Sequence, residues 1–169
     1  MLAPYFADDS TWERFLSIAE SWIGTPYKHM TMVKGRGADC TLFIGACWLE
    51  MGILTAVTYD YYPKDWHLHT DDEYVLAGLY RHFRDHIAEG FALRHCEPTE
   101  PELRGDLLTF AMTQRNVSNH SAIYLGPYRG QGAHILHSIN GRGVKPFPYE
   151  GLFSRKRKHI FRIMRWVSE

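Results

Sequence analysis

Apolar residues recur at helical spacing near the start of the chain. Between residues 10 and 23 the large apolar side chains stand three or four positions apart: Trp12, Phe15, Leu16, Ala19, Trp22 and Ile23. This spacing predicts an amphipathic helix. Ser10 and Glu13 have the spacing of a capping box at its start. Pro26 follows in a Gly-Thr-Pro turn and ends the helix, because proline cannot continue the hydrogen-bond ladder.

Two more helices are predicted after a glycine-bearing loop. Residues 40–51 are nearly all apolar and meet Gly52, which is typical of a buried helix with a glycine C-cap. Residues 52–69 are irregular and rich in aromatic side chains. Residues 70–89 return to helical spacing, with Thr70 and Glu73 in a second capping-box pattern.

The hydrophobic period changes to that of strands after a segment rich in Pro and Glu at residues 97–102. The predicted strands are Asp106–Met112, Ser121–Leu125, Ala133–Ser138 and His159–Trp166, with a weaker one at Val144–Phe147. Helices followed by adjacent strands favour an α+β fold over an alternating one. The length of 169 residues suits one domain, 1–169.

Charge and composition narrow the function classes. Lys plus Arg equals Asp plus Glu at 19 each, which argues against nucleic acid or an anionic membrane as partner. The basic run at 155–158 is interpreted as a solvated turn before a strand. No apolar run approaches the roughly 18 residues of a membrane span, and no signal peptide is visible. We therefore expect a chain made as a soluble cytoplasmic protein, without membrane insertion.

The three cysteines, Cys40, Cys47 and Cys96, are predicted to be free thiols. Cys40 stands where a glycine-bearing loop enters a helix. The positive end of the helix dipole and the unpaired N–H groups there favour a thiolate, and the same N–H groups suit an oxyanion. Cys47, two turns further along the same helix, has the pattern of an inert core thiol.

A nucleophilic thiol needs a base and a group that orients the base. His120 opens the predicted strand 121–125, and His137 lies in the next strand. Neighbouring antiparallel strands can bring two such side chains onto one face. The chain has ten histidines, so spacing alone does not decide between a catalytic pair and a chance one.

Three segments, in order, resemble the NlpC family of bacterial cell-wall cysteine peptidases. AESWIGTPYKHMTMVKGRGADC is similar to the helix, Gly-x-Pro-Tyr turn and Asp-Cys motif of that family. RGDLLTF and SNHSAIYLG are similar to its Gly-Asp-Leu strand and the strand that carries its base. HILHSINGRGV is similar to its last polar site. Together they span roughly residues 18–145.

The resemblance implies a papain-like domain in which the nucleophile helix packs on an antiparallel β-sheet. It also implies that Cys40 is the nucleophile, His120 the general base and His137 the residue that orients His120. Tyr27 matches the family tyrosine near the oxyanion, and Asp39 supports the loop. The implied reaction is cleavage of an amide bond in peptidoglycan stem peptides, with no cofactor and no metal.

Some positions depart from the family pattern. Thr41 and Leu42 stand where the family has Ser-Gly, and Ala122 replaces a glycine after the base; all three are expected to add bulk near the cleft. A long gap between the histidines leaves His134 as a rival to His137. The two face opposite sides of an ideal strand, so only one can point at His120.

Other histidines and aromatic residues allow more than one interpretation. His29 either lines the cleft or packs locally. His82 and His86 have a spacing that can hold zinc but lack a third ligand, and a solvated helix face is favoured. The aromatic residues at 59–66 form either a glycan or protein contact or a satellite core, and the core is favoured.

The pattern around residues 24–40 and the basic C-terminal strand resemble the phage-type branch of the family. That branch contains tail-associated peptidases of phages and gene transfer agents, so phage-like tail proteins are implied as partners and a virion or tail particle as the location. Two alternatives stay open: a catalytically weak or inactive structural tail-tip component, and an acyltransferase or amidase acting on a non-wall substrate.

Overall fold

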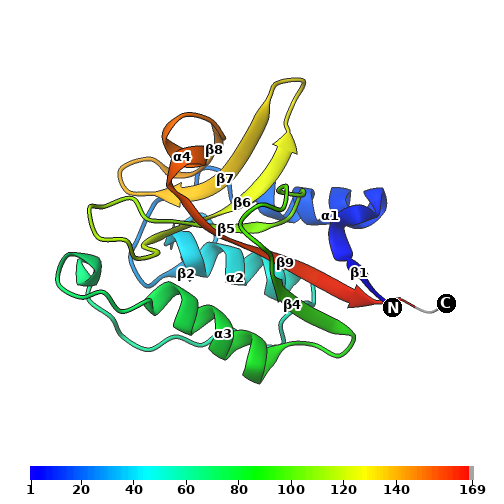
Figure 1. Ribbon diagram of the computed structural model, residues 1–169, viewed down its shortest axis with the longest axis horizontal. Helices are drawn as coiled ribbons and strands as arrows, with labels where there is room; N and C mark the ends of the chain where they lie inside the picture. The colour runs from blue at the N-terminus through cyan, green and yellow to red at the C-terminus, as the bar shows by residue number, and fades with distance from the viewer. Residues whose placement is uncertain (168–169) are drawn as a thin grey trace.

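A computed structural model describes residues 1–167 of the chain (Figure 1). The α-helices are α1 (Asp9–Glu20), α2 (Cys40–Glu50), α3 (Tyr74–His86) and α4 (Leu152–Lys156), with 3-10 turns η1 (Tyr5–Ala7) and η2 (Trp66–Leu68). The strands are β1 (Leu2–Pro4), β2 (Met32–Val33), β3 (Gly37–Ala38), β4 (Phe91–His95), β5 (Leu107–Phe110), β6 (His120–Pro127), β7 (Ala133–Ile139), β8 (Gly143–Pro148) and β9 (Arg157–Trp166).

The sheet is antiparallel, in the order β1-β9-β5-β6-β7-β8, with β4 also paired to β9. One face carries the larger core, to which α1, α2 and α3 contribute; α4 packs with a smaller core on the other face (Figure 1). Side chains alternate between these cores along β6: Ile123 belongs to the first and Ala122 to the second. The fold is thus the expected α+β arrangement, with α2 packed on the sheet.

Helix α2 is buried around most of its circumference, because its residues 42–48 are all buried. It packs against β6 and β7 at the centre of the molecule. Burial on all sides explains why its sequence is almost uninterruptedly apolar instead of amphipathic. Gly52, at a φ of 77°, follows its last turn as the sequence predicted. No helix within residues 1–167 is long and apolar enough to cross a membrane.

Both predicted capping boxes are wrong. The N-cap of α1 is Asp8, whose carboxylate accepts a hydrogen bond from the Thr11 N–H at 2.8 Å. Helix α3 begins at Tyr74, not at Thr70, and Glu73 caps nothing with its side chain. Instead the Glu73 carboxylate binds the Ser118 N–H and pairs with Lys158. These two contacts outside the helix take the place of a capping hydrogen bond from the Glu73 side chain.

The five predicted strands are present, and four short strands and one short helix were missed. β1 and β4 are the outer partners of β9, so their polar or irregular patterns are set by pairing at the edge, not by a buried face. The basic run 155–158 is not a free turn. It ends α4 and opens β9, with Arg157 paired to Glu102.

Candidate active site

Cys40 is the first residue of α2, and the loop before it is fastened by Asp39. The buried Asp39 carboxylate accepts hydrogen bonds from the N–H groups of Thr41 at 3.0 Å, Leu42 at 2.7 Å and Met30 at 3.0 Å. Asp39 thus caps α2 and ties it to the preceding loop. Its contacts give it a structural role, and they fix where the Cys40 sulfur lies.

The start of α2 docks against the start of β6. The Thr41 and Ser121 hydroxyls lie 3.1 Å apart, and Ser121 is close enough to the Cys40 sulfur to lower the pKa of the thiol slightly. The Cys40 Sγ is also 3.8 Å from the Thr41 Oγ1. The half-buried thiol therefore rests on the residue that follows His120. Within residues 1–167 no hydrogen bond joins the sulfur to His120 itself.

His120 and His137 form a bonded pair across β6 and β7. The His120 Nε2 lies 2.8 Å from the His137 Nδ1, and the rings are 5.0 Å apart at 70°. Phe147 and Phe153 pack against the His137 ring. His134 points elsewhere: its Nδ1 donates to the Gly132 carbonyl at 2.7 Å. Of the two rivals, the structure brings His137 to His120.

The pairing fixes which tautomer can act as a base. A His120 that accepts a proton at Nδ1 carries its own hydrogen on Nε2 and donates it to the His137 Nδ1. His137 then carries its hydrogen on Nε2, an atom that is buried and has no hydrogen-bond partner within residues 1–167. Phe147 and Phe153 pack against the ring that carries this nitrogen. His137 can thus orient His120 without offering it a negative charge.

The resting state of Cys40 is the thiol, contrary to the expectation of a stabilised thiolate. Burial, and next the charge of Asp39, raise the pKa of Cys40 to about 11, against smaller effects of hydrogen bonds from Thr41 and Ser121. Besides burial, Asp39 opposes a thiolate because it occupies the helix N–H groups of Thr41 and Leu42. The capping carboxylate neutralises the end of the helix that would have favoured the anion.

Both histidines of the pair are neutral at neutral pH. Burial lowers the pKa of His120 to about 3, with His137 adding to the effect. Burial and the charge of Lys145 lower the pKa of His137 to about 4. A neutral thiol beside a neutral imidazole suits general-base catalysis, in which the proton moves as the sulfur attacks, better than a preformed ion pair.

Tyr27 lies near the sulfur. Burial, then the charges of Cys40 and Asp39, raise the pKa of Tyr27, so its hydroxyl stays a hydrogen-bond donor. The Lys64 ammonium stands 5.7 Å from the centre of the Tyr27 ring. With Thr41 and Leu42 occupied, the Cys40 N–H and the Tyr27 hydroxyl are the candidate donors for an oxyanion.

Sequence reasoning missed Tyr62. Its hydroxyl lies 3.4 Å from the Asp39 carboxylate, and its carbonyl oxygen is 3.0 Å from the His29 Nε2. The His29 and Tyr62 rings also meet edge to face. His29 thus packs locally and holds the aromatic segment at the site. The aromatic segment at residues 59–66 was the sequence feature that could have pointed to Tyr62. Its side chains differ in burial, since Trp66 is 5% exposed and Tyr61 is 80% exposed.

The remaining candidates lie away from the sulfur of Cys40. Cys47 is fully buried in the larger core, and burial raises its pKa, as expected for an inert thiol. Cys96 is buried in the smaller core. The His82 ring is used within the protein, since its Nδ1 donates to the Gly78 carbonyl and its Nε2 accepts from the Thr58 N–H. His82 and His86 rings stand 6.1 Å apart.

The comparisons with known proteins identify the fold. No protein-family model and no curated protein matches the sequence. Two solved structures are similar in three dimensions. The first is the NlpC/p60 domain of the peptidoglycan hydrolase SagA, with a TM-score of 0.51 and 18% identity, over 88% of this chain and 96% of that one. The second is NlpC1 from Trichomonas vaginalis, with a TM-score of 0.53 and 17% identity over 93% of this chain.

The chain has the papain-like fold of NlpC/p60 domains. This chain covers 45% of the Trichomonas protein, which is therefore much longer than the shared domain. At such identities the likeness defines the arrangement of helices and strands. The chemistry of this NlpC/p60-like chain has to be argued from its own residues.

Proposed function

We propose that this chain is a cysteine peptidase that cleaves an amide bond in peptidoglycan stem peptides. The observation that carries the proposal is the placement of the Cys40 thiol against Ser121, one residue from the bonded pair His120–His137. The fold shared with a domain of a peptidoglycan hydrolase supports the choice of substrate. Three ordered sequence motifs support the same choice.

The neutral resting groups define the first step. Substrate binding brings His120 onto the thiol, since catalytic hydrogen bonds often tighten only in the complex. His120 takes the proton of Cys40 as the sulfur attacks the amide carbonyl, and His137 accepts the hydrogen bond from the His120 Nε2–H. The Cys40 N–H and the Tyr27 hydroxyl stabilise the oxyanion. His120 then protonates the leaving amine, and water, deprotonated by His120, releases the acyl group.

The departures from the family pattern do not block this site. Ala122 is fully buried in the smaller core with Ile135 and Phe153, so its methyl group contacts protein and not substrate. Thr41 uses its hydroxyl to hold Ser121. The expectation that Ala122 adds bulk to a cleft is therefore wrong, which weakens the case for an inactive structural component.

The two cysteines of α2 test the proposal. Cys40→Ala should abolish release of stem-peptide fragments from purified sacculi, measured by liquid chromatography and mass spectrometry. Cys47→Ala is the matched control, because it removes a thiol from the same helix in the buried core. Both variants should be compared by thermal unfolding. Release by Cys40→Ala at the wild-type rate would overturn the proposal.

We further propose that the enzyme acts as part of a phage-like tail, with tail proteins as partners and the virion or tail particle as its location. The support is the resemblance of residues 24–40 and the C-terminal strand to the phage-type branch. Mass spectrometry of purified particles from the producing cells tests it. Detection of the chain in stoichiometric amount with tail proteins is expected, and its absence from particles would contradict the setting.

A further inference from the structure

An apolar channel runs between α2 and α3, under the segment that joins them. Its volume is about 400 Å³, within the range of small-molecule pockets. The apolar lining comes from Leu42 and Trp48 of α2, Leu54 and Val57 of the connection, and Leu79 of α3. Charge is confined to an ion pair between Asp60 and Arg81. A lining of this kind favours an aliphatic ligand over a polar one, whose desolvation it would not offset.

Two glycines give the channel its width. Gly45 lies on the face of α2 between Leu42 and Trp48, and Gly78 lies in the middle of the lining face of α3. A Cβ on Gly45 would come within 3.3 Å of Val57, whereas a Cβ on Gly78 would meet nothing within 4 Å. Glycine inside a helix lowers stability relative to alanine. The close contact with Val57 explains Gly45, whereas Gly78 faces open space that a larger side chain would fill.

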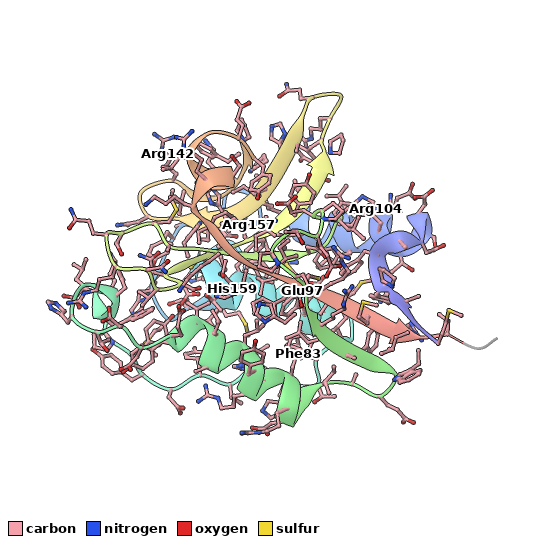
Figure 2. All side chains as sticks on the ribbon, in the orientation of Figure 1. Phe83, Glu97, Arg104, Arg142, Arg157 and His159 are labelled. Carbon is pink, nitrogen blue, oxygen red and sulfur yellow. The ribbon has the colours of Figure 1, made fainter. Side chains whose placement is uncertain are left out.

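The channel begins at the nucleophile. Thr41 lines it, and the Thr41 Oγ1 is 3.8 Å from the Cys40 sulfur. Tyr62 lines the same end and reaches Asp39. At the other end the Trp48 ring meets Phe83 of α3 at 5.2 Å (Figure 2). The seven-residue advance from Thr41 to Trp48 corresponds to about 10 Å along a helix. The apolar lining therefore extends for about this length along α2, from the residue beside the nucleophile to Trp48.

We infer that this channel binds an unbranched, medium-length acyl chain whose carbonyl lies at Cys40, so that the enzyme also hydrolyses acyl esters of this class. A linear chain can follow an apolar channel of this length from its end beside Cys40, whereas a compact side chain would leave the other end empty. The inference rests on the nucleophilic role proposed above for Cys40. It does not depend on the stem peptide being a substrate.

The reaction balances with the groups already described. His120 takes the proton of the Cys40 thiol, and the sulfur forms a bond to the ester carbonyl carbon. The C–O bond breaks, and the alcohol leaves with the proton from His120. Water then gives a proton to His120 and adds its oxygen to the thioester. The carboxylic acid leaves, and the thiol regains its proton.

Chain-length selectivity tests the inference. The kcat/KM for p-nitrophenyl octanoate is compared with that for p-nitrophenyl butyrate. Each buried methylene contributes about fourfold, so the octanoate should exceed the butyrate about tenfold or more. Gly78→Leu fills the channel and should bring this ratio close to one. Gly132→Leu is the control: an added Cβ there also meets nothing within 4 Å, and Gly132 lies outside the channel, so the ratio should persist.

A binding measurement separates the channel from the nucleophile. Octanamide should bind the Cys40→Ala protein in calorimetry, and the additional change Gly78→Leu should remove that binding. Equal rates on both esters, with no octanamide bound, would overturn the inference; the sacculus assay on the same preparation then decides the proposed peptidase independently. Hydrolysis of neither ester would likewise overturn the inference, and the sacculus assay would again decide the proposed peptidase separately.

Discussion

Two pairs of histidines bridge neighbouring strands of the same sheet, and only one of them has the setting of an active site. His120 and His137 join β6 to β7 at 2.8 Å, beside the thiol and among phenylalanine rings. His95 and His159, the second of which is labelled in Figure 2, join β4 to β9 at 3.1 Å, and His95 is exposed. Both are imidazole pairs with nearly the same geometry. Burial and the neighbouring nucleophile distinguish them, so a bonded pair of histidines does not by itself indicate catalysis.

Replacing one histidine of each pair, His120 or His159, should give the largest difference in activity. His120→Ala should lower kcat/KM for stem-peptide release about 10²- to 10⁴-fold, the usual contribution of a general base. His159→Ala should leave kcat/KM within about twofold, because His159 touches no reacting group. Steady-state kinetics on sacculi or a soluble stem peptide measures both. Equal losses in the two variants would mean that the buried pair acts only through stability.

Replacing the second histidine of each pair, His137 or His95, should give a smaller difference in kcat. His137→Phe should lower kcat about tenfold to a hundredfold with little change in KM, because His120 is then free to rotate. His137→Asn should recover part of the rate, since its amide oxygen can accept the His120 Nε2–H. His95→Phe is the matched control. If His137→Asn were no better than His137→Phe, a positioning role would be refuted.

Acid stability separates the pairs by burial. The pKa of His137 falls to about 4 and that of His120 to about 3 in the folded chain, against about 6.5 when unfolded. As the pH falls, these two histidines therefore bind protons in the unfolded chain before they do so in the folded chain. Stability is fully present above pH 6.5 and is lost as the pH falls toward 4, by at most about 1.4 kcal/mol per pH unit for each histidine.

Denaturant unfolding at pH 7 and pH 5 measures this difference. His137→Phe should lose less stability than the wild type over that interval, because it lacks one buried histidine. His95→Phe, which removes an exposed ring, should lose about as much stability as the wild type. An acid sensitivity unchanged by His137→Phe would show that the buried ring is not the source.

The smallest expected effect is that of pH on activity. A base with a pKa of about 3 and a thiol with a pKa of about 11 keep their protonation states between pH 5 and pH 8. The rate should therefore vary by no more than about threefold over that range. Iodoacetamide labelling of Cys40 should instead rise with pH, because the thiolate is the species that is alkylated. Fast labelling at pH 6 would reveal a preformed ion pair.

The repeating patterns made the helices and the main strands predictable. A continuous apolar run marked α2, and alternation marked the strands from β5 to β9. The caps of α1 and α3 were not predictable, because Glu73 has the right spacing for a cap but binds Ser118 and Lys158. Short edge strands such as β1 carry no periodic signal in so few residues.

The proximity of the candidate site residues was predictable, but their protonation was not. Sequence spacing and the family resemblance singled out Cys40, His120 and His137, which the structure gathers at one place. The raised pKa of Cys40 depends on a carboxylate that turns back onto the helix end, a tertiary detail that a motif does not record. The choice of His137 over His134 likewise needed the register of β6 on β7.

Strand β8 links the two halves of the site. Gly143 has a φ of 69°, and a Cβ there would come within 2.3 Å of the Thr25 carbonyl oxygen. The Val144 N–H donates to the Thr25 carbonyl at 2.8 Å, and the Gly24 N–H donates to the Val144 carbonyl at 2.9 Å. The next residue of β8, Lys145, lies opposite His137 in the strand register. The turn before Tyr27 is thus attached to the strand next to the orienting histidine. During synthesis the thiol emerges early and this strand emerges late. A nascent chain that ends before residue 143 therefore carries Cys40 without the strand that holds the turn before Tyr27, and the candidate site is completed only when most of the chain has been made.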